Sequence, residues 1–371
     1  MLIIRVYVWN TLSRFGDEGG ISTKTFMASL AYVVFKDPKS FIFEMVWKKV
    51  IRDCFLEKLR QHCPHYAIWT GVFNSRDVSS QTRTRFYIVG VNVNKVVIET
   101  PMQEWGQFMN STMTLINPQT LEALSLSGDD PYLQTAFQHA YAKIERSDTT
   151  LDLKGESWPA CYENHCRVRK FLSENDMEIP DTKVAVNSLL IAARTEAEGQ
   201  PCWMDVLPAR EIDVLAVHLY THSMYQSTDG DIDAIGCSLP PFHDLPDFHW
   251  DLTNNVWMGR HKHESTEGLL PCITKGHRLW NVKKMRPWLG KELLRAQGFP
   301  KDVKTTFNED DQHVPAPIKV AISQRLGRKA ITDIDCMKLA GNTMTVPLMM
   351  LLQVFLEIHI SWTKTPTPKP G

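Results

Sequence analysis

A short apolar run that carries a single acid constrains the fold of this chain more than any other feature. Residues 40–46, SFIFEMV, predict a buried strand with one carboxylate, Glu44. Residues 25–35 before it have apolar side chains at helical spacing, and residues 47–62 after it have the length and periodicity of a helix. Residues 86–93, rich in β-branched and aromatic side chains, predict another strand. Strands that alternate with helices indicate an α/β sheet.

The middle of the chain differs in composition. Between about residues 100 and 265 it is rich in Trp, His, Pro, Asp and Ser and only weakly periodic, which predicts a second, irregular domain. Order returns with a helix over 289–296 that stops at Gln297-Gly298-Phe299-Pro300. Further helices are expected over 315–327 and in the apolar stretch after Asn342.

Composition excludes several classes of protein. The net charge is −1, with 43% hydrophobic and 22% charged residues, which excludes a disordered chain, a fibrous repeat and a strongly basic tail. A basic face for DNA would therefore have to be local. The eight cysteines are scattered without a CxxC pair, so no metal site is predicted. No apolar run approaches the length that crosses a bilayer, so no membrane partner is predicted.

Three separated segments contain residues that could take part in binding or catalysis. Glu44 lies near the carboxyl end of its strand, where open α/β sheets bind ligands, although such an acid can also simply reach solvent. Arg83 and Arg85 are two residues apart, which puts both guanidiniums on one side of an extended segment, to meet a carboxylate, a phosphate or a base edge. Two solvated arginines are the alternative. Gly341 and Asn342 suit a tight turn and a helix cap, which is also how an ordinary loop enters a helix.

Taken in order, these segments resemble the DNA cytosine-5 methyltransferase family. Glu44-Met45-Val46 is similar to the family's Glu-Asn-Val segment, and the Gln81, Arg83 and Arg85 pattern to its Gln-x-Arg-x-Arg segment. Gly341-Asn342 resembles its late Gly-Asn segment. The stretch from Glu292 to Pro300 also looks like a family motif, as does the preceding 270–274. The resemblance covers about residues 10–95 and 250–358.

The resemblance implies a partial Rossmann-like class I methyltransferase domain with a second, irregular target-recognition domain. The expected boundaries are residues 1–99 for the catalytic part, 100–300 for the target-recognition part, 301–358 for the return to the catalytic domain, and 359–371 for a disordered tail. The implied cofactor is S-adenosyl-L-methionine and the implied partner is DNA. RNA stays open, since a small subgroup of the family acts on transfer RNA. A monomer in the nucleus is expected.

Residue roles follow from the same resemblance. Glu44 would be the catalytic acid that meets ring N3 of cytosine, and Arg83 and Arg85 would position the base and the acid. Three residues would position the substrate and three would help to build the cofactor pocket: Gln81, Gln297 and Gly298 for the first role, and Gly341, Asn342 and Thr343 for the second.

The chain departs from the family at the nucleophile. The family's thiol stands four residues before a Ser that matches Ser13, and this position holds Trp9. No Cys precedes Cys54, the Phe-x-Gly-x-Gly cofactor loop is absent, and Met45 replaces the usual Asn. We therefore expect no methyl transfer by this chain.

Two explanations compete for these departures. A truncated version of an active enzyme is favoured, because Glu44, Arg83, Arg85 and Asn342 all remain in their expected positions. A non-catalytic DNA-binding paralogue or scaffold is the alternative. An unrelated α/β hydrolase or transferase is disfavoured, because the chain has no Gly-x-Ser-x-Gly elbow and no phosphate loop.

Overall fold

The chain folds into two units, each with its own internal contacts. One unit comprises residues 1–119 together with 343–371, and the other comprises 120–342. The computed structural model describes the following parts of them: residues 2–5, 21–46, 49–144, 159–174, 203–208, 210–218, 249–253, 268–274, 278–301 and 332–362.

The first unit is built on a four-stranded sheet with the strand order β1-β2-β4-β3. Its strands are β1 (Leu2–Arg5), β2 (Ser40–Val46), β3 (Tyr66–Asn74) and β4 (Thr84–Asn92). Strand β1 is parallel to β2, whereas β4 is antiparallel to both of its neighbours. The run 40–46 forms β2 as predicted, and it is buried from Ser40 to Met45. The predicted α/β sheet is thus confirmed.

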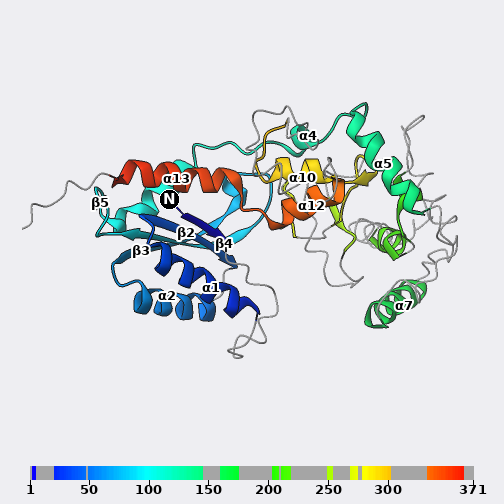
Figure 1. Ribbon diagram of the computed structural model, residues 1–371. Coiled ribbons are helices and arrows are strands. Elements are labelled where there is room, and N and C mark those ends of the chain that lie inside the picture. The colour runs from blue at the N-terminus through cyan, green and yellow to red at the C-terminus, as the bar shows by residue number, and fades with distance from the viewer. Residues whose placement is uncertain are drawn as a thin grey trace, which may run out of the picture. The chain divides into compact units, whose positions relative to one another are not determined.

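Helices cover both faces of this sheet (Figure 1). Helices α1 (Ile21–Lys36) and α2 (Lys49–His62) lie on one face, and α3 (Trp105–Met113) and α13 (Val346–His359) on the other. The alternation of side chains along β2 explains the two cores, because Phe41 and Phe43 point to the first face and Ile42 to the second. A short ladder between β5 (Val97–Ile98) and β9 (Ile360–Ser361) follows α13.

The boundary between the units differs from the predicted one. The contacts divide the chain after residues 119 and 342, rather than after 99 and 300. Residues 100–119 lie in the first unit because Trp105, Met109 and Met113 of α3 share a core with α13. The apolar face of α3 thus outweighs the change in composition near residue 100.

The second unit contains a small antiparallel sheet of three strands in the order β6-β7-β8. The strands are β6 (His249–Asp251), β7 (Leu279–Asn281) and β8 (Arg286–Pro287). Its helices are α4 (Leu121–Leu124), α5 (Pro131–Ile144), α7 (Pro159–Ser173), one over 210–218, α10 (Gly290–Ala296) and α12 (Asp333–Asn342). The helix expected over 315–327 lies outside the described residues.

Helices α10 and α12 pack closely because Gly290 has no side chain. A Cβ at this position would lie 2.3 Å from the carbonyl oxygen of Asp333 and 2.5 Å from Cβ of Cys336. The amide of Gly290 donates to Oδ1 of Asp333 over 2.6 Å, which fixes the start of α10 against the start of α12. Within the described ranges no single helix is long and apolar enough to span a membrane. The bent pair α12 and α13 reaches that length and apolar composition only when the two helices are taken together.

Candidate active site

The structure brings Glu44, Arg83 and Arg85 together in the first unit. Oε1 of Glu44 lies 3.6 Å from Nη2 of Arg83 and 3.5 Å from Nε of Arg85. The side chains of Glu44 and Arg83 are 2% and 1% exposed, and that of Arg85 is 15% exposed. Since buried charges are stable only when paired, one carboxylate here holds two guanidiniums in place.

The arrangement follows from strand pairing. Strands β2 and β4 are antiparallel neighbours, with Val46 opposite Arg85 and Glu44 opposite Tyr87. Residues two apart on an extended segment face the same side, so Arg83, just before β4, and Arg85 at its start both reach the acid.

The side chains of Asn74 and Ser75, which no sequence pattern had marked, hold the loop before β4. Oδ1 of Asn74 accepts from the amides of Arg76 and Arg83 at 3.2 and 3.0 Å. The amide of Ser75 donates to the Arg83 carbonyl (3.1 Å), and the Ser75 hydroxyl donates to the Gln81 carbonyl (2.9 Å). Asn and Ser favour such local bonds to the backbone, and this was the available signal in the sequence.

Gln81 connects the loop with a distant part of the first unit. Its side chain is fully buried, and Nε2 donates to Oγ1 of Thr345 over 3.4 Å. Thr345 immediately precedes α13 and was not among the predicted site residues. The Gln-x-Arg-x-Arg segment is therefore joined to the segment that follows Gly341-Asn342.

Gly341 and Asn342 do not form the predicted turn and cap. Both lie in the last turn of α12, and Gly341 is buried there. The residue that caps α13 is Thr345, which makes no capping bond with its side chain. Contacts of α12 with α10 keep the helix intact through Gly341, although glycine has low helix propensity.

Gln297 and Gly298 lie in the second unit, where each has a structural contact. Nε2 of buried Gln297 donates to the carbonyl of Ala340 over 2.7 Å, which ties the end of α10 to α12. Gly298 has a φ of +89°, a left-handed conformation that favours glycine after a helix. Their role in substrate positioning stays a prediction, as do those of the other candidate residues. Trp9 and Ser13 lie outside the described residues.

Comparison with known proteins relates the chain to DNA cytosine-5 methyltransferases. The DNA (cytosine-5-)-methyltransferase DMT5 of Cryptococcus neoformans var. grubii serotype A is 25% identical over 313 residues. The match covers 80% of this chain and 11% of that protein, so the chain spans about a tenth of the length of its relative. The predicted resemblance to this family is thereby confirmed. No protein-family model matches the chain.

Two solved structures of methyltransferases are similar at low scores. A DNA modification methyltransferase encoded within an E. coli prophage matches with a TM-score of 0.41 and 12% identity, over 91% of this chain and 74% of that one. The methyltransferase EhMeth of Entamoeba histolytica matches with a TM-score of 0.35 and 9% identity, over 95% and 75% of the two chains. At these scores neither structure adds to the architecture that the chain's own strands and helices define.

Proposed function

We propose that this chain is part of a DNA cytosine-5 methyltransferase, in which the first unit handles the target base. The observation that carries the proposal is the buried cluster of Glu44, Arg83 and Arg85 at adjacent ends of β2 and β4. The sequence relationship to a DNA (cytosine-5-)-methyltransferase supports it. DNA as partner, S-adenosyl-L-methionine as methyl donor and a nuclear monomer belong to the same proposal.

The cluster suits a reaction in which charge moves on a cytosine ring. A carboxyl group that donates a proton or a hydrogen bond to ring N3 activates position 6 of the ring toward addition of a nucleophile, and only the adduct formed in this way is an enamine that is nucleophilic at position 5. Glu44 would serve as this group. Arg83 and Arg85 would hold the carboxylate and the base edge at fixed angles, because guanidinium is planar and permanently charged. The base must first leave the duplex to reach such a site.

The methyl donor has little support among the described residues. Asn342 and Thr343 offer a partly exposed amide and hydroxyl, but Gly341 is buried inside α12. These residues do not by themselves fit a cofactor pocket. No chemical step is therefore assigned to them, and a thiol nucleophile is likewise not assigned to any residue of the chain.

The test begins with the transcript upstream of Met1. If the gene encodes a Pro-Cys loop and a Gly-rich loop in frame, the full product is expected to transfer labelled methyl groups from S-adenosyl-L-methionine to cytosine in duplex DNA. Glu44→Gln should lower this rate by about 10²-fold or more, as expected for loss of a general acid. Glu57→Gln, an exposed acid on α2, is the matched control and should leave the rate unchanged.

Glu44 also supports the fold, so a second variant is needed. Arg85→Lys keeps the positive charge but loses the planar fork, and should reduce the methyl-transfer rate about tenfold or more at full DNA affinity. Circular dichroism at the assay temperature verifies that each variant is folded. A product that carries both loops and transfers no methyl groups would overturn the proposal, as would an unaffected rate in folded Glu44→Gln.

The non-catalytic alternative is favoured by one observation, the Trp at the position of the thiol. It predicts a transcript without either loop and a chain that binds DNA but not S-adenosyl-L-methionine. Calorimetric titration of the full gene product with the cofactor distinguishes it from the enzyme.

A further inference from the structure

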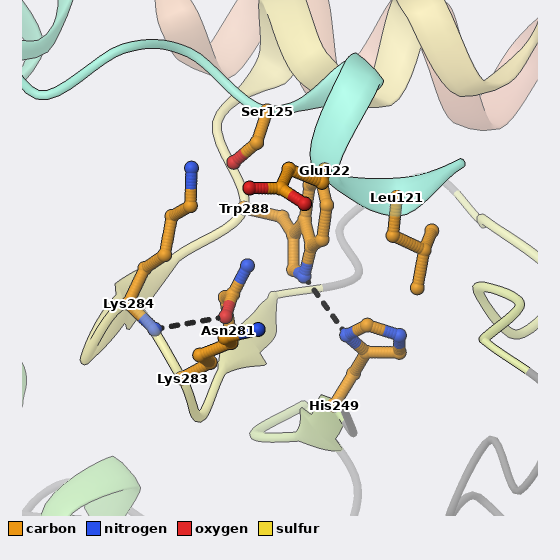
Figure 2. A pocket seen from close by; sticks show the side chains of 8 residues that line it. All are labelled: Leu121, Glu122, Ser125, His249, Asn281, Lys283, Lys284 and Trp288. Carbon is orange, nitrogen blue, oxygen red and sulfur yellow. Dashed lines mark hydrogen bonds between the residues drawn. The ribbon is translucent and has the colours of Figure 1, made fainter. Parts of the chain in front are cut away.

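A hairpin in the second unit presents two adjacent lysines beside a pocket. Strands β7 and β8 are joined by a tight tip at which Lys283 and Lys284 are exposed. Oδ1 of Asn281 accepts from the amide of Lys284 over 3.0 Å, and Met285 takes a positive φ of 49°, so the tip has a defined shape. Figure 2 shows the pocket, which is lined by Leu121, Glu122, Ser125, His249, Asn281, Lys283, Lys284 and Trp288.

Two aromatic side chains that line the pocket, Trp288 and His249, are joined by a hydrogen bond. Nε1 of Trp288 donates to Nδ1 of His249 over 3.0 Å, and both rings are almost completely buried. Neither ring is therefore accessible enough to stack on an unpaired base, since Trp288 is only 1% exposed.

The wall of the pocket is held by a buried ion pair. Arg286 donates to both carboxylate oxygens of Glu292, at 2.8 and 2.6 Å. The same carboxylate accepts from the amide of Leu126 (2.6 Å) and from the hydroxyl of Ser125 (3.2 Å). The hairpin that carries the lysines and the segment opposite it are thus joined at one buried point, which preorganises the pocket before a ligand arrives.

Among the described residues that line the pocket, the lysines outnumber the carboxylates. Lys283 and Lys284 contribute two ammonium groups, and exposed Glu122 contributes one carboxylate. The ammonium of Lys284 donates to the carbonyl of Leu126 over 3.4 Å, and within the described ranges it forms no ion pair with a carboxylate. Burial and the neighbouring charge of Arg286 lower the pKa of Lys284, because both disfavour its charged form. An anion beside the ammonium would offset this cost.

We propose that this pocket binds a backbone phosphate of DNA, with Lys283 and Lys284 as its two cationic contacts. The inference rests on the proposed function for the identity of the nucleic acid. A phosphate suits the site better than a base edge, because the accessible groups are ammonium ions, which meet phosphates as point charges. A contact of this kind fixes the orientation of the second unit on the duplex without reading sequence.

The experiment compares DNA binding by the full chain with that of a double variant. Fluorescence anisotropy with a labelled duplex is measured for Lys283→Gln/Lys284→Gln between 50 and 300 mM KCl, which are about the salt concentrations where phosphate contacts dominate affinity. The matched control is Lys301→Gln/Lys338→Gln, which removes two exposed lysines of the same unit outside the pocket. Thermal unfolding verifies that both variants are folded.

We expect the pocket variant to bind about tenfold more weakly near 100 mM KCl, with a slope of log K against log [KCl] that is shallower by about 0.9 for each lost phosphate contact. The control should keep the slope of the unaltered chain. Equal slopes for the two variants would overturn the inference. So would stabilisation by inorganic phosphate that is lost in the pocket variant while its DNA slope is unchanged, because the pocket would then hold only a free anion.

This outcome is separate from the test of methyl transfer. A shallower slope in the pocket variant of a chain that transfers no methyl groups supports the pocket and counts against the enzyme alone. An unchanged slope in a product that methylates DNA counts against the pocket alone.

Discussion

Gln81 and Thr345 are 264 residues apart in sequence and share a hydrogen bond of 3.4 Å in the core of the first unit. Gln81 belongs to the loop that leads to Arg83, and Thr345 begins the apolar helix α13. This bond links the start of α13 with the loop that leads to the arginines, so helix α13 and this loop stabilise each other's position.

Thr345→Val should therefore destabilise the first unit. Valine has nearly the same shape but cannot accept the bond, which leaves a buried amide of Gln81 with one partner fewer. We expect a loss of about 1–2 kcal/mol in the free energy of unfolding, measured with urea. Thr84→Val, at an exposed position of β4, is the matched control and should change this value by less than about 0.5 kcal/mol.

Glu44 is expected to have different coupling energies with Arg83 and with Arg85. Glu44→Gln leaves two guanidiniums without their carboxylate and should cost about 3 kcal/mol, as for other buried ion pairs that lose one member. In double-mutant cycles with Arg83→Gln and Arg85→Gln, the coupling should be larger for Arg83, whose side chain is 1% exposed against 15% for Arg85. Equal coupling energies in urea unfolding would contradict this account of the cluster.

Asp333, the first residue of α12, is expected to make the stability of the second unit depend on pH. Burial raises the pKa of Asp333 to about 6, although hydrogen bonds from Gly290 and Tyr132 oppose the shift. Since the folded pKa lies above the ordinary value of 3.8, the contribution of this group is complete below about pH 4 and is lost as pH rises through 6. Asp333→Asn keeps the acceptor oxygen and removes the titration.

The measurement is urea unfolding of both proteins at several pH values. The stability of the unaltered chain relative to Asp333→Asn should fall between about pH 4 and 7, by no more than about 3 kcal/mol. A difference that stays constant over this range would show that Asp333 does not titrate there.

Asp37 in the first unit is expected to make stability depend on pH in the opposite direction. Hydrogen bonds from Lys95 and then from His65 lower the pKa of this carboxyl to about 2. Its stabilising effect is present above the ordinary pKa of 3.8 and is lost as pH falls through about 2. Asp37→Asn should remove about 1 kcal/mol near neutral pH, a figure reduced for solvent screening because the side chain is 39% exposed.

Asparagine suits this position in other respects. Asp37 has a positive φ of 42°, a conformation that Asn tolerates better than most residues, so the substitution tests charge rather than backbone strain. Thermal unfolding at about pH 2 and 7 provides the comparison. A loss of equal size at both values would mean that the carboxylate charge is not the source of the stabilisation.

The sequence was most informative where one strong pattern was present. Strand β2 and helices α1 and α2 were predictable because their apolar residues follow a single period without competing signals. Strand β3 was missed because most of its side chains are only half-buried, which weakens the alternation on which strand prediction depends.

The candidate site was predictable only in part. The meeting of Glu44 with Arg83 and Arg85 follows from side-chain alternation once β2 and β4 are known to be neighbours. Thr345 and the hairpin lysines carry no local signal, because their roles depend on pairings between distant segments. Gly341 was misassigned to a turn because a tertiary contact overrode its low helix propensity.

The burial of Glu44 and Arg83 has a consequence for comparing related genes. Losing Glu44 would remove this carboxylate from buried Arg83, and losing Arg83 would leave buried Glu44 with one guanidinium fewer, so purifying selection for folding alone would retain both residues. A descendant that had abandoned catalysis would keep this acid and its arginines for as long as it kept its sheet. A nucleophile that is no member of this buried cluster is not retained by it, so the presence or loss of the nucleophile is the character that separates working enzymes from silent copies.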